Sequence, residues 1–282
     1  MLYGFLNIYK EKGKTSFDVI RELRKKLNIK KIGHTGTLDP LAEGVLIVAV
    51  GQATKLIEFM MKDEKDYSAE IILGKNSDTY DAEGKIEDVG NQKPDFDKVQ
   101  EVVGTFIGEI EQIPPKYSAL KINGKKAYEM ARNGEEFEMK SRKVTIKNIA
   151  IIDYKYPFLE IDVSCSSGTY IRSLANDIGK KLETGAYLNA LKRTRVGNFI
   201  IKNSINLKEF KESDIIPVEA VSLNYECIEI DENDLKKLNL GQFIEKNEIK
   251  DQIVCAFYNN KLIGIIERTK NGLYKYKKKL NI

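Results

Sequence analysis

One loop-forming segment contains the residue types from which an active site could be built. Asp39 stands directly before Pro40, and His34, the single histidine of the chain, lies five residues earlier. The proline fixes its own φ and pushes Asp39 towards an extended conformation, while glycines at 33, 36 and 44 permit tight turns. A carboxylate on a stiff loop ahead of the apolar run 45–50 could serve as a catalytic nucleophile. Asp before proline is also a common turn pair, and a lone histidine usually makes an ordinary hydrogen bond, so spacing alone leaves both roles open.

The elements that must position this loop predict an α+β protein. Thr15 and Asp18 have the spacing of a capping box, and apolar residues at helical spacing follow them. Further helices are predicted over residues 96–106 and 171–182. Alternating or continuous apolar residues predict strands over 2–9, 45–50, 67–73, 143–154, 158–165 and 192–201.

The character of the chain changes near residue 222. Short apolar runs beyond this point predict strands, and Asn259 and Asn260 between two of them suit a hairpin turn. We therefore expect two domains, residues 1–221 and residues 222–282.

Composition indicates a folded protein and excludes several function classes. The chain of 282 residues is 42% hydrophobic and 31% charged. Its longest clean apolar run, 45–50, is far shorter than the roughly 20 residues of a membrane span. The start of the chain does not resemble a secretion signal. Three cysteines, Cys165, Cys227 and Cys255, are odd in number and far apart, which is typical of a reducing cytoplasm and offers neither a disulfide framework nor a zinc site.

Positive charge is concentrated in four segments. Residues 10–31, 116–147, 192–211 and 268–282 together carry a net +22, although the whole chain carries only +4. Segregation of this size could present a basic face to a nucleic acid. Lysine-rich segments are also ordinary solvated surfaces, so charge alone does not decide between the two.

A longer pattern around Asp39 identifies a family. The run His34-Thr35-Gly36-Thr37-Leu38-Asp39-Pro40-Leu41-Ala42 closely resembles the catalytic motif of the TruB family, whose members convert uridine 55 of the tRNA T-loop to pseudouridine. Further segments resemble that family in the same order: 51–55, 65–67, 74–84, 113–121, 124–132 and 168–172. The resemblance covers residues 3 to about 200 and is weaker beyond.

The resemblance implies a role for each matching residue. Asp39 would attack a uridine flipped out of the RNA, and Arg172 would keep that carboxylate ionised in a dry pocket. Tyr170 would contact the reacting nucleotide, and Tyr67 would stack on the extruded uracil, which is worth roughly 1–3 kcal/mol per base. Leu191 would form an apolar pocket wall. Without the resemblance, Arg172 could be a surface residue and the others ordinary core residues. The order of bond-making, at C1′, at C6 or through a glycal, is left open.

Recognition residues are implied in the same way. His34 would fill the space that the flipped base leaves in the RNA. The basic, tyrosine-containing stretch within 114–143 resembles the RNA-gripping thumb insertion, and its Lys121, Lys126 and Arg132 would contact RNA. We expect this thumb to be mobile without RNA and ordered with it. One departure concerns the turn before the first helix, where Lys10-Glu11-Lys12-Gly13 lacks the family's proline after the lysine. This leaves the stiffness of the turn, and a supporting role for Lys10, open.

The fold implied is of the pseudouridine synthase type: a large mixed, mainly antiparallel sheet flanked by helices, followed by a small PUA-like β domain. We expect this second domain to touch the acceptor-stem side of tRNA. The isomerisation adds and removes no atoms, so no cofactor and no metal are expected. The expected partner is the tRNA T-arm; no protein partner or membrane is implied, and we expect a cytoplasmic monomer. Three alternatives remain: a guide-RNA-dependent or other-RNA pseudouridine synthase, an RNA-binding or tRNA-folding protein with incidental catalysis, and a glycosidase-like enzyme acting on free nucleosides.

Overall fold

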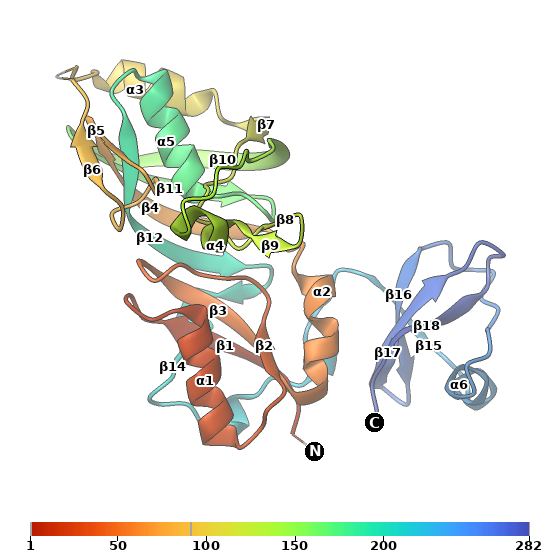
Figure 1. Ribbon diagram of the computed structural model, residues 1–282. Coiled ribbons are helices and arrows are strands. Elements are labelled where there is room, and N and C mark those ends of the chain that lie inside the picture. The colour runs from red at the N-terminus through yellow and green to blue at the C-terminus, as the bar shows by residue number, and fades with distance from the viewer. Residues whose placement is uncertain (1, 91, 282) are drawn as a thin grey trace.

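A ten-stranded sheet forms the body of the molecule (Figure 1). The computed structural model describes residues 2–90 and 92–281. The strands are, in spatial order, β14 (Ile205–Asn206), β1 (Gly4–Lys10), β3 (Ala42–Val50), β12 (Ala186–Val196), β4 (Lys65–Leu73), β11 (Phe158–Cys165), β10 (Arg142–Lys155) and β7 (Gly108–Gln112), with β13 (Phe199–Ile200) beside β12 and β2 (Ile32–His34) beside β3. Only β1–β14 and β3–β12 pair in parallel, so the predicted mixed, mainly antiparallel sheet is confirmed.

Three helices cover one face of this sheet: α1 (Ser16–Leu27), α3 (Phe96–Gly104) and α5 (Ile171–Lys181). Their apolar residues, such as Leu23, Val99 and Leu174, share one buried cluster with Leu46 and Val48 of β3. The predicted capping box of α1 is present, with Thr15 and Asp18 bonding each other's backbone N–H. All three helices were predicted from the spacing of apolar residues.

The opposite face of the sheet is buried as well. Phe5, Val45 and Ile47 alternate with the residues of the first face and belong to a second cluster. This burial on both faces explains why β3 reads as a continuous apolar run. The cover on this side comes from the 3₁₀ helix η1 (Gly51–Leu56), from α2 (Ile57–Met60) and from a second sheet.

The second sheet contains four strands, β15 (Glu226–Glu229), β16 (Ile253–Tyr258), β17 (Lys261–Arg268) and β18 (Tyr274–Lys279), and is accompanied by α6 (Glu232–Asn239). Asn259 and Asn260, both at positive φ, form the predicted hairpin turn between β16 and β17. Figure 1 shows this small β unit beside α2 at one end of the large sheet. Its Leu262 and Ile265 pack in the same cluster as Leu56 and Phe59.

Two short hairpins and one helix lie outside the two larger sheets. They are β5 (Lys75–Ser77) with β6 (Ile86–Asp88), β8 (Lys121–Ile122) with β9 (Lys125–Lys126), and α4 (Ala127–Arg132). The last three elements lie within residues 114–143 and project in front of the sheet in Figure 1.

One predicted strand has different bounds. The sequence pattern placed a strand over 192–201, whereas β12 begins at Ala186 and ends at Val196. Gly197 adopts a left-handed φ of 52°, and the chain turns back there to pair β13 with the end of β12. A glycine in this conformation ends a strand, because it reverses the chain direction at little steric cost. Across residues 2–90 and 92–281, no helix combines the length and apolar character that crossing a membrane requires.

Candidate active site

Hydrogen bonds from the first helix hold the loop that carries Asp39. Ser16 lies at the start of α1, where its hydroxyl donates to the carbonyl of Leu38 at 3.0 Å and accepts from the Leu38 N–H at 2.8 Å. The N–H of Gly13 donates to the carbonyl of Pro40 at 2.7 Å. Leu38 and Leu41 on either side are buried. Asp39 is thereby fixed on a loop between β2 and β3.

Arg193 of β12 secures the same loop from the other side. Its guanidinium is 2% exposed and donates to the carbonyl oxygens of Gly36, Thr37 and Val45. Close approach of the two strands requires Gly44, whose φ is 104° and where a Cβ would stand 2.3 Å from the carbonyl oxygen of Arg193. The glycine of the motif thus allows β12 to reach the Asp39 loop.

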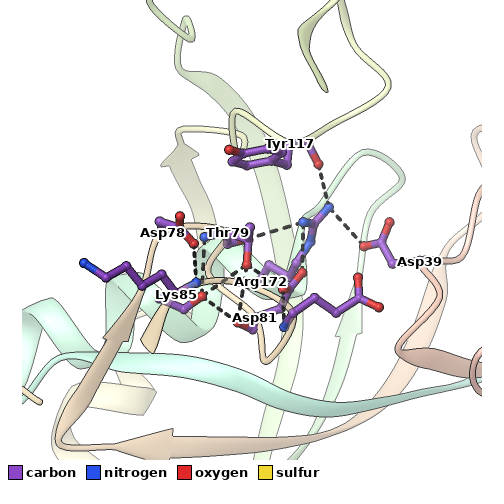
Figure 2. Close-up of polar contacts among 9 residues, drawn as sticks. Asp39, Asp78, Thr79, Asp81, Lys85, Tyr117 and Arg172 are labelled. Atoms are coloured by element: carbon purple, nitrogen blue, oxygen red, sulfur yellow. Dashed lines mark hydrogen bonds and ion pairs between the residues drawn. The ribbon is translucent and has the colours of Figure 1, made fainter. Parts of the chain in front are cut away.

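Arg172, in the first turn of α5, joins Asp39 to a second carboxylate. Its Nη2 lies 3.0 Å from Oδ2 of Asp39, and its Nη1 lies 3.0 Å from Oδ2 of Asp81. Figure 2 shows the guanidinium between the two acids, with the carbonyl of Tyr117 accepting a further bond at 3.0 Å. The side chains of Arg172 and Asp81 are 7% and 2% exposed, whereas that of Asp39 is 35% exposed. The free side of Asp39 therefore faces the cleft.

Burial and the neighbouring cation act on Asp39 in opposite directions. Burial raises the pKa of the Asp39 carboxyl, the Arg172 guanidinium lowers it, and the like charge of Asp81 raises it. The net direction is upward. A carboxylate whose pKa is raised in this way is more basic than a free aspartate, and its ionised form depends on the ion pair with Arg172.

Tyr170 occupies the N-cap position of the same helix and is held through its backbone. The side chain of Gln112 accepts from the Tyr170 N–H at 2.8 Å and donates to the Tyr170 carbonyl at 3.0 Å. The phenol ring lines the cleft that contains Asp39 and Arg172. Because two hydrogen bonds fix the backbone, the ring occupies a defined position at the cleft wall.

The cleft has a volume of about 740 Å³ and is lined by both Tyr67 and Leu191. Tyr67 on β4 is buried, and burial raises the pKa of its hydroxyl. Leu191 on β12 stands opposite Ala69 of β4 and Ala42 of β3. Tyr67 and Leu191 come from strands that are far apart in sequence. Because β12 and β4 are neighbours in the sheet, both side chains line the floor of the same cleft.

The predicted recognition residues are only partly gathered at this cleft. Arg132 at the end of α4 lines it, and its guanidinium lies 5.6 Å from the Tyr128 ring. Lys121 and Lys126 lie on β8 and β9, outside the cleft lining. His34 is half-buried on β2, also outside the lining, and burial lowers the pKa of its imidazole.

Lys10 supports the neighbouring turn although the family's proline is missing. Its side chain is fully buried, and Nζ donates to the carbonyl oxygens of Glu11 at 3.1 Å and Lys14 at 2.6 Å. Burial lowers the pKa of Lys10 to about 8, although the nearby Asp39 carboxylate favours the charged form. Glu11 in place of proline forms an ion pair with Lys14 and leaves this turn intact.

Sequence reasoning missed three residues that organise the site: Asp81, Arg193 and Gln112. Asp81 lies in the predicted acidic loop, but Asp78 and Glu83 are its close neighbours and nothing in the sequence ranks the three. Arg193 bonds the backbone of Val45, which is 148 residues away in sequence, and Gln112 bonds the backbone of Tyr170, which is 58 residues away. A signal existed only for Asp81, as part of the acidic segment 74–84.

Within residues 2–90 and 92–281, no group of three or more histidine, cysteine or acidic side chains could hold a metal ion. What the cleft contains is a partly exposed carboxylate, a buried guanidinium, a tyrosine at the wall and an apolar floor.

Comparison with solved structures shows the same fold. The chain superposes on a protein in the "Structure of H/ACA RNP bound to a substrate RNA containing 2'-deoxyuridine" with a TM-score of 0.75 and 23% identity, covering 99% of this chain and 85% of the other. A "Crystal Structure of a Cbf5-Nop10-Gar1 Complex" gives a TM-score of 0.73 at 25% identity, covering 95% and 79%.

Sequence relatives and family models are more specific. The chain is 44% identical over 279 residues to tRNA pseudouridine synthase B of Clostridium tetani, covering 95% of this chain and 96% of the relative. It is 45% identical over 262 residues to the protein of that name from Caldanaerobacter subterraneus subsp. tengcongensis, covering 91% of each. The model "TruB family pseudouridylate synthase (N terminal domain)" matches residues 24–171, and "tRNA pseudouridylate synthase B C-terminal domain" matches residues 172–221. The chain belongs to the TruB family of pseudouridylate synthases.

Proposed function

We propose that this protein isomerises uridine 55 in the T-loop of tRNA to pseudouridine, with Asp39 as the nucleophile. The observation that carries the proposal is the half-open carboxylate of Asp39, bonded to the buried Arg172 at the floor of a nucleotide-sized cleft. Relatives of 44–45% identity along nearly their whole length, named for this activity on tRNA, support the substrate class.

The reaction breaks the N1–C1′ bond of the uridine, turns the uracil and joins C5 to C1′, while the proton on C5 is lost and N1 gains one. Asp39 supplies the electron pair that makes this exchange possible by forming a transient bond to the nucleotide. Arg172 keeps the carboxylate ionised until the bond forms. Tyr170, at the cleft wall, contacts the reacting nucleotide and assists removal of the C5 proton.

The uridine must leave the RNA stack before Asp39 can reach it. Tyr67 stacks on the extruded uracil and so offsets part of the cost of unstacking, and Leu191 forms the apolar wall beside it. His34 occupies the space that the base vacates in the RNA. Lys121, Lys126 and Arg132, on the thumb segment 114–143, hold the T-arm by phosphate contacts.

The division of labour between two domains is part of the proposal. Residues 1–221 form the catalytic domain with its thumb, and residues 222–282 form a PUA-like RNA-binding domain. The protein acts as a monomer on the tRNA T-arm, and this substrate implies a cytoplasmic location. A guide-RNA-directed enzyme is the main rival; the relatives named for tRNA are about 20 percentage points more identical to this chain than the H/ACA protein is.

Product mapping tests the proposal. The purified chain is incubated with an unmodified T-arm hairpin, and carbodiimide-reactive uridines are then located by primer extension. We expect one reactive position, at the uridine corresponding to 55, with no added RNA. A hairpin carrying cytidine there is the control. Absence of product on the hairpin, or product only when a second RNA is supplied, would refute the proposal in favour of the guide-dependent rival.

A further inference from the structure

Arg142 stands at the rim of the cleft, and the proposed function gives this residue no role. It is the first residue of β10, at the C-terminal end of the thumb segment 114–143, and is paired with Gln112 of β7. Its guanidinium carbon lies 4.6 Å from the centroid of the Tyr170 ring, and its Nη2 donates to the carbonyl of Gly168. The guanidinium therefore lies over the ring of the tyrosine at the cleft wall.

Arg142 differs from Arg172 and Arg193, the two arginines at the base of the cleft, because most of its guanidinium donors have no protein partner. Arg172 is neutralised by two carboxylates, and Arg193 gives its donors to three backbone carbonyls. Among the described residues, no acidic side chain forms an ion pair with Arg142, and its bond to Gly168 is the one hydrogen bond of its guanidinium. Its Nε is buried and without a partner.

An incompletely bonded guanidinium in a cleft points to a missing acceptor. Arginine has five N–H donors in a planar fork that matches a phosphate bidentately, and stacking on an aromatic ring leaves the edges of that fork available. The buried Nε has lost contact with water without gaining an acceptor, which is unfavourable. The chemistry that fits is a phosphodiester group.

We propose that Arg142 binds a backbone phosphate of the substrate RNA next to the extruded uridine. The inference rests on the proposed function, because it places that nucleotide against Asp39 and Tyr170. Tyr170, which carries the Arg142 guanidinium on its ring, is two residues from Arg172 and lines the same cleft as Asp39. Flipping a nucleotide turns its flanking phosphates towards the protein, and a cation at the wall neutralises one of them.

Salt dependence of RNA binding tests the charge contact. In an Asp39→Asn background, chosen to remove turnover, Kd for a T-arm hairpin is measured against potassium chloride concentration. Arg142→Gln should lower the slope of log Kd against log salt by about 0.7–0.9, the value for one phosphate contact. Arg142→Lys, which keeps the charge, should restore most of it.

Lys143→Gln provides a matched control. Lys143 is the next residue of β10, is exposed, and pairs with Glu109 at 2.7 Å. The substitution removes the same charge one residue away but outside the cleft lining. The slope should change much less than with Arg142→Gln. Equal slopes in Arg142→Gln and the parent protein would overturn the inference.

A substitution on the RNA identifies the phosphate. Hairpins with one uncharged methylphosphonate linkage at each position of the T-loop are titrated against the parent and Arg142→Gln proteins. The parent should lose about tenfold in affinity at one linkage flanking the target uridine, where Arg142→Gln loses nothing further. Identical profiles for the two proteins would contradict the proposal. If the wild-type chain converts the unmodified hairpin while the profiles are identical, the phosphate contact alone fails; if it does not convert the hairpin, the proposed function itself fails.

Discussion

The ion pair of Asp39 and Arg172 is the smallest unit on which the proposed chemistry depends. Asp39 shares the guanidinium with Asp81, which is nearly fully buried and makes a second 3.0 Å contact. Asp81 thus orients Arg172 towards the loop, although its negative charge works against ionisation of Asp39. Asp81 can therefore hold the Arg172 guanidinium in place while Asp39, the more exposed of the two acids, stays reactive.

Replacing the cation should move the pH dependence of catalysis. Burial raises the pKa of Asp39 and Arg172 opposes this shift. Arg172→Gln therefore raises the Asp39 pKa further. Because the ionised form is the active one, activity is present above this pKa and lost as the pH falls through it. The acid limb of the single-turnover rate profile should move to higher pH.

Arg195→Gln is the control for that experiment. Arg195 forms an arginine–carboxylate pair with Asp66, away from the cleft lining. Its loss should leave the acid limb in place even if stability falls. An unmoved acid limb in Arg172→Gln would show that Arg172 does not set the ionisation of Asp39.

At the residue scale, motif resemblance predicted Asp39 as the nucleophile and Arg172 as its cation, and the structure brings these two side chains into contact. It did not identify Asp81 or Arg193, because their functions arise only from contacts across 91 and 148 residues of chain. A strand arginine and one acid among several have no local signature. His34, Lys121 and Lys126 lie outside the cleft lining in the RNA-free chain, and their roles stay predictions.

At the scale of elements, the junction of α1 with the Asp39 loop should tune catalysis. Ser16 satisfies both backbone groups of Leu38 in a buried setting. Ser16→Ala leaves them unpaired, which costs about 1–3 kcal/mol of stability, and it frees the loop. We expect a lower single-turnover rate with RNA affinity nearly unchanged.

Thr15→Ala is the neighbouring control, since it removes the helix cap but not the loop contact. It should cost about 0.5–2 kcal/mol in thermal or denaturant unfolding, with the rate per folded molecule retained. Equal rate losses in both variants would mean that helix stability, rather than the Ser16 contacts, governs the loop.

The thumb segment should change its dynamics on binding. Between residues 121 and 133 it is built from two-residue strands and a six-residue helix, of which only Ala127 is buried. So little buried area predicts local opening at low free energy. Amides of this segment should exchange rapidly in the free protein and become protected with T-arm RNA, measured by hydrogen–deuterium exchange. Strong protection without RNA would contradict this.

Element boundaries show what local patterns can predict. Helix α1 was predictable because capping residues and apolar spacing agree. The end of β12 was not, because apolar residues continue through Phe199 and Ile200 after the turn at Gly197. The apolar pattern of the sequence runs through both strands and does not indicate the reversal between them.

At the scale of the whole molecule, the two sheets share a hydrophobic cluster. Leu262, Ile265 and Leu280 pack with residues of η1 and of the β3 face. Removing residues 222–282 would expose this cluster, so the role of the second domain is better tested on its surface. Its β18 strand carries the exposed lysines Lys275, Lys277 and Lys279.

Replacing Lys275, Lys277 and Lys279 together by glutamine should weaken the binding of whole tRNA, because phosphate contacts are lost. KM for whole tRNA should rise, whereas KM for an isolated T-arm hairpin should change little, since the hairpin lacks the acceptor stem. Steady-state kinetics on the two substrates provide the comparison. Equal changes on both would place the second domain outside the tRNA contact.

The most direct test of the central claim is the turnover of Asp39→Asn on T-arm RNA, measured beside its binding affinity. Asparagine keeps the size of the side chain but cannot supply the nucleophilic carboxylate. We predict that pseudouridine formation falls by several orders of magnitude while Kd stays within about threefold, because phosphate contacts dominate RNA affinity. Pseudouridine formed at a rate near that of the wild-type chain would contradict the account.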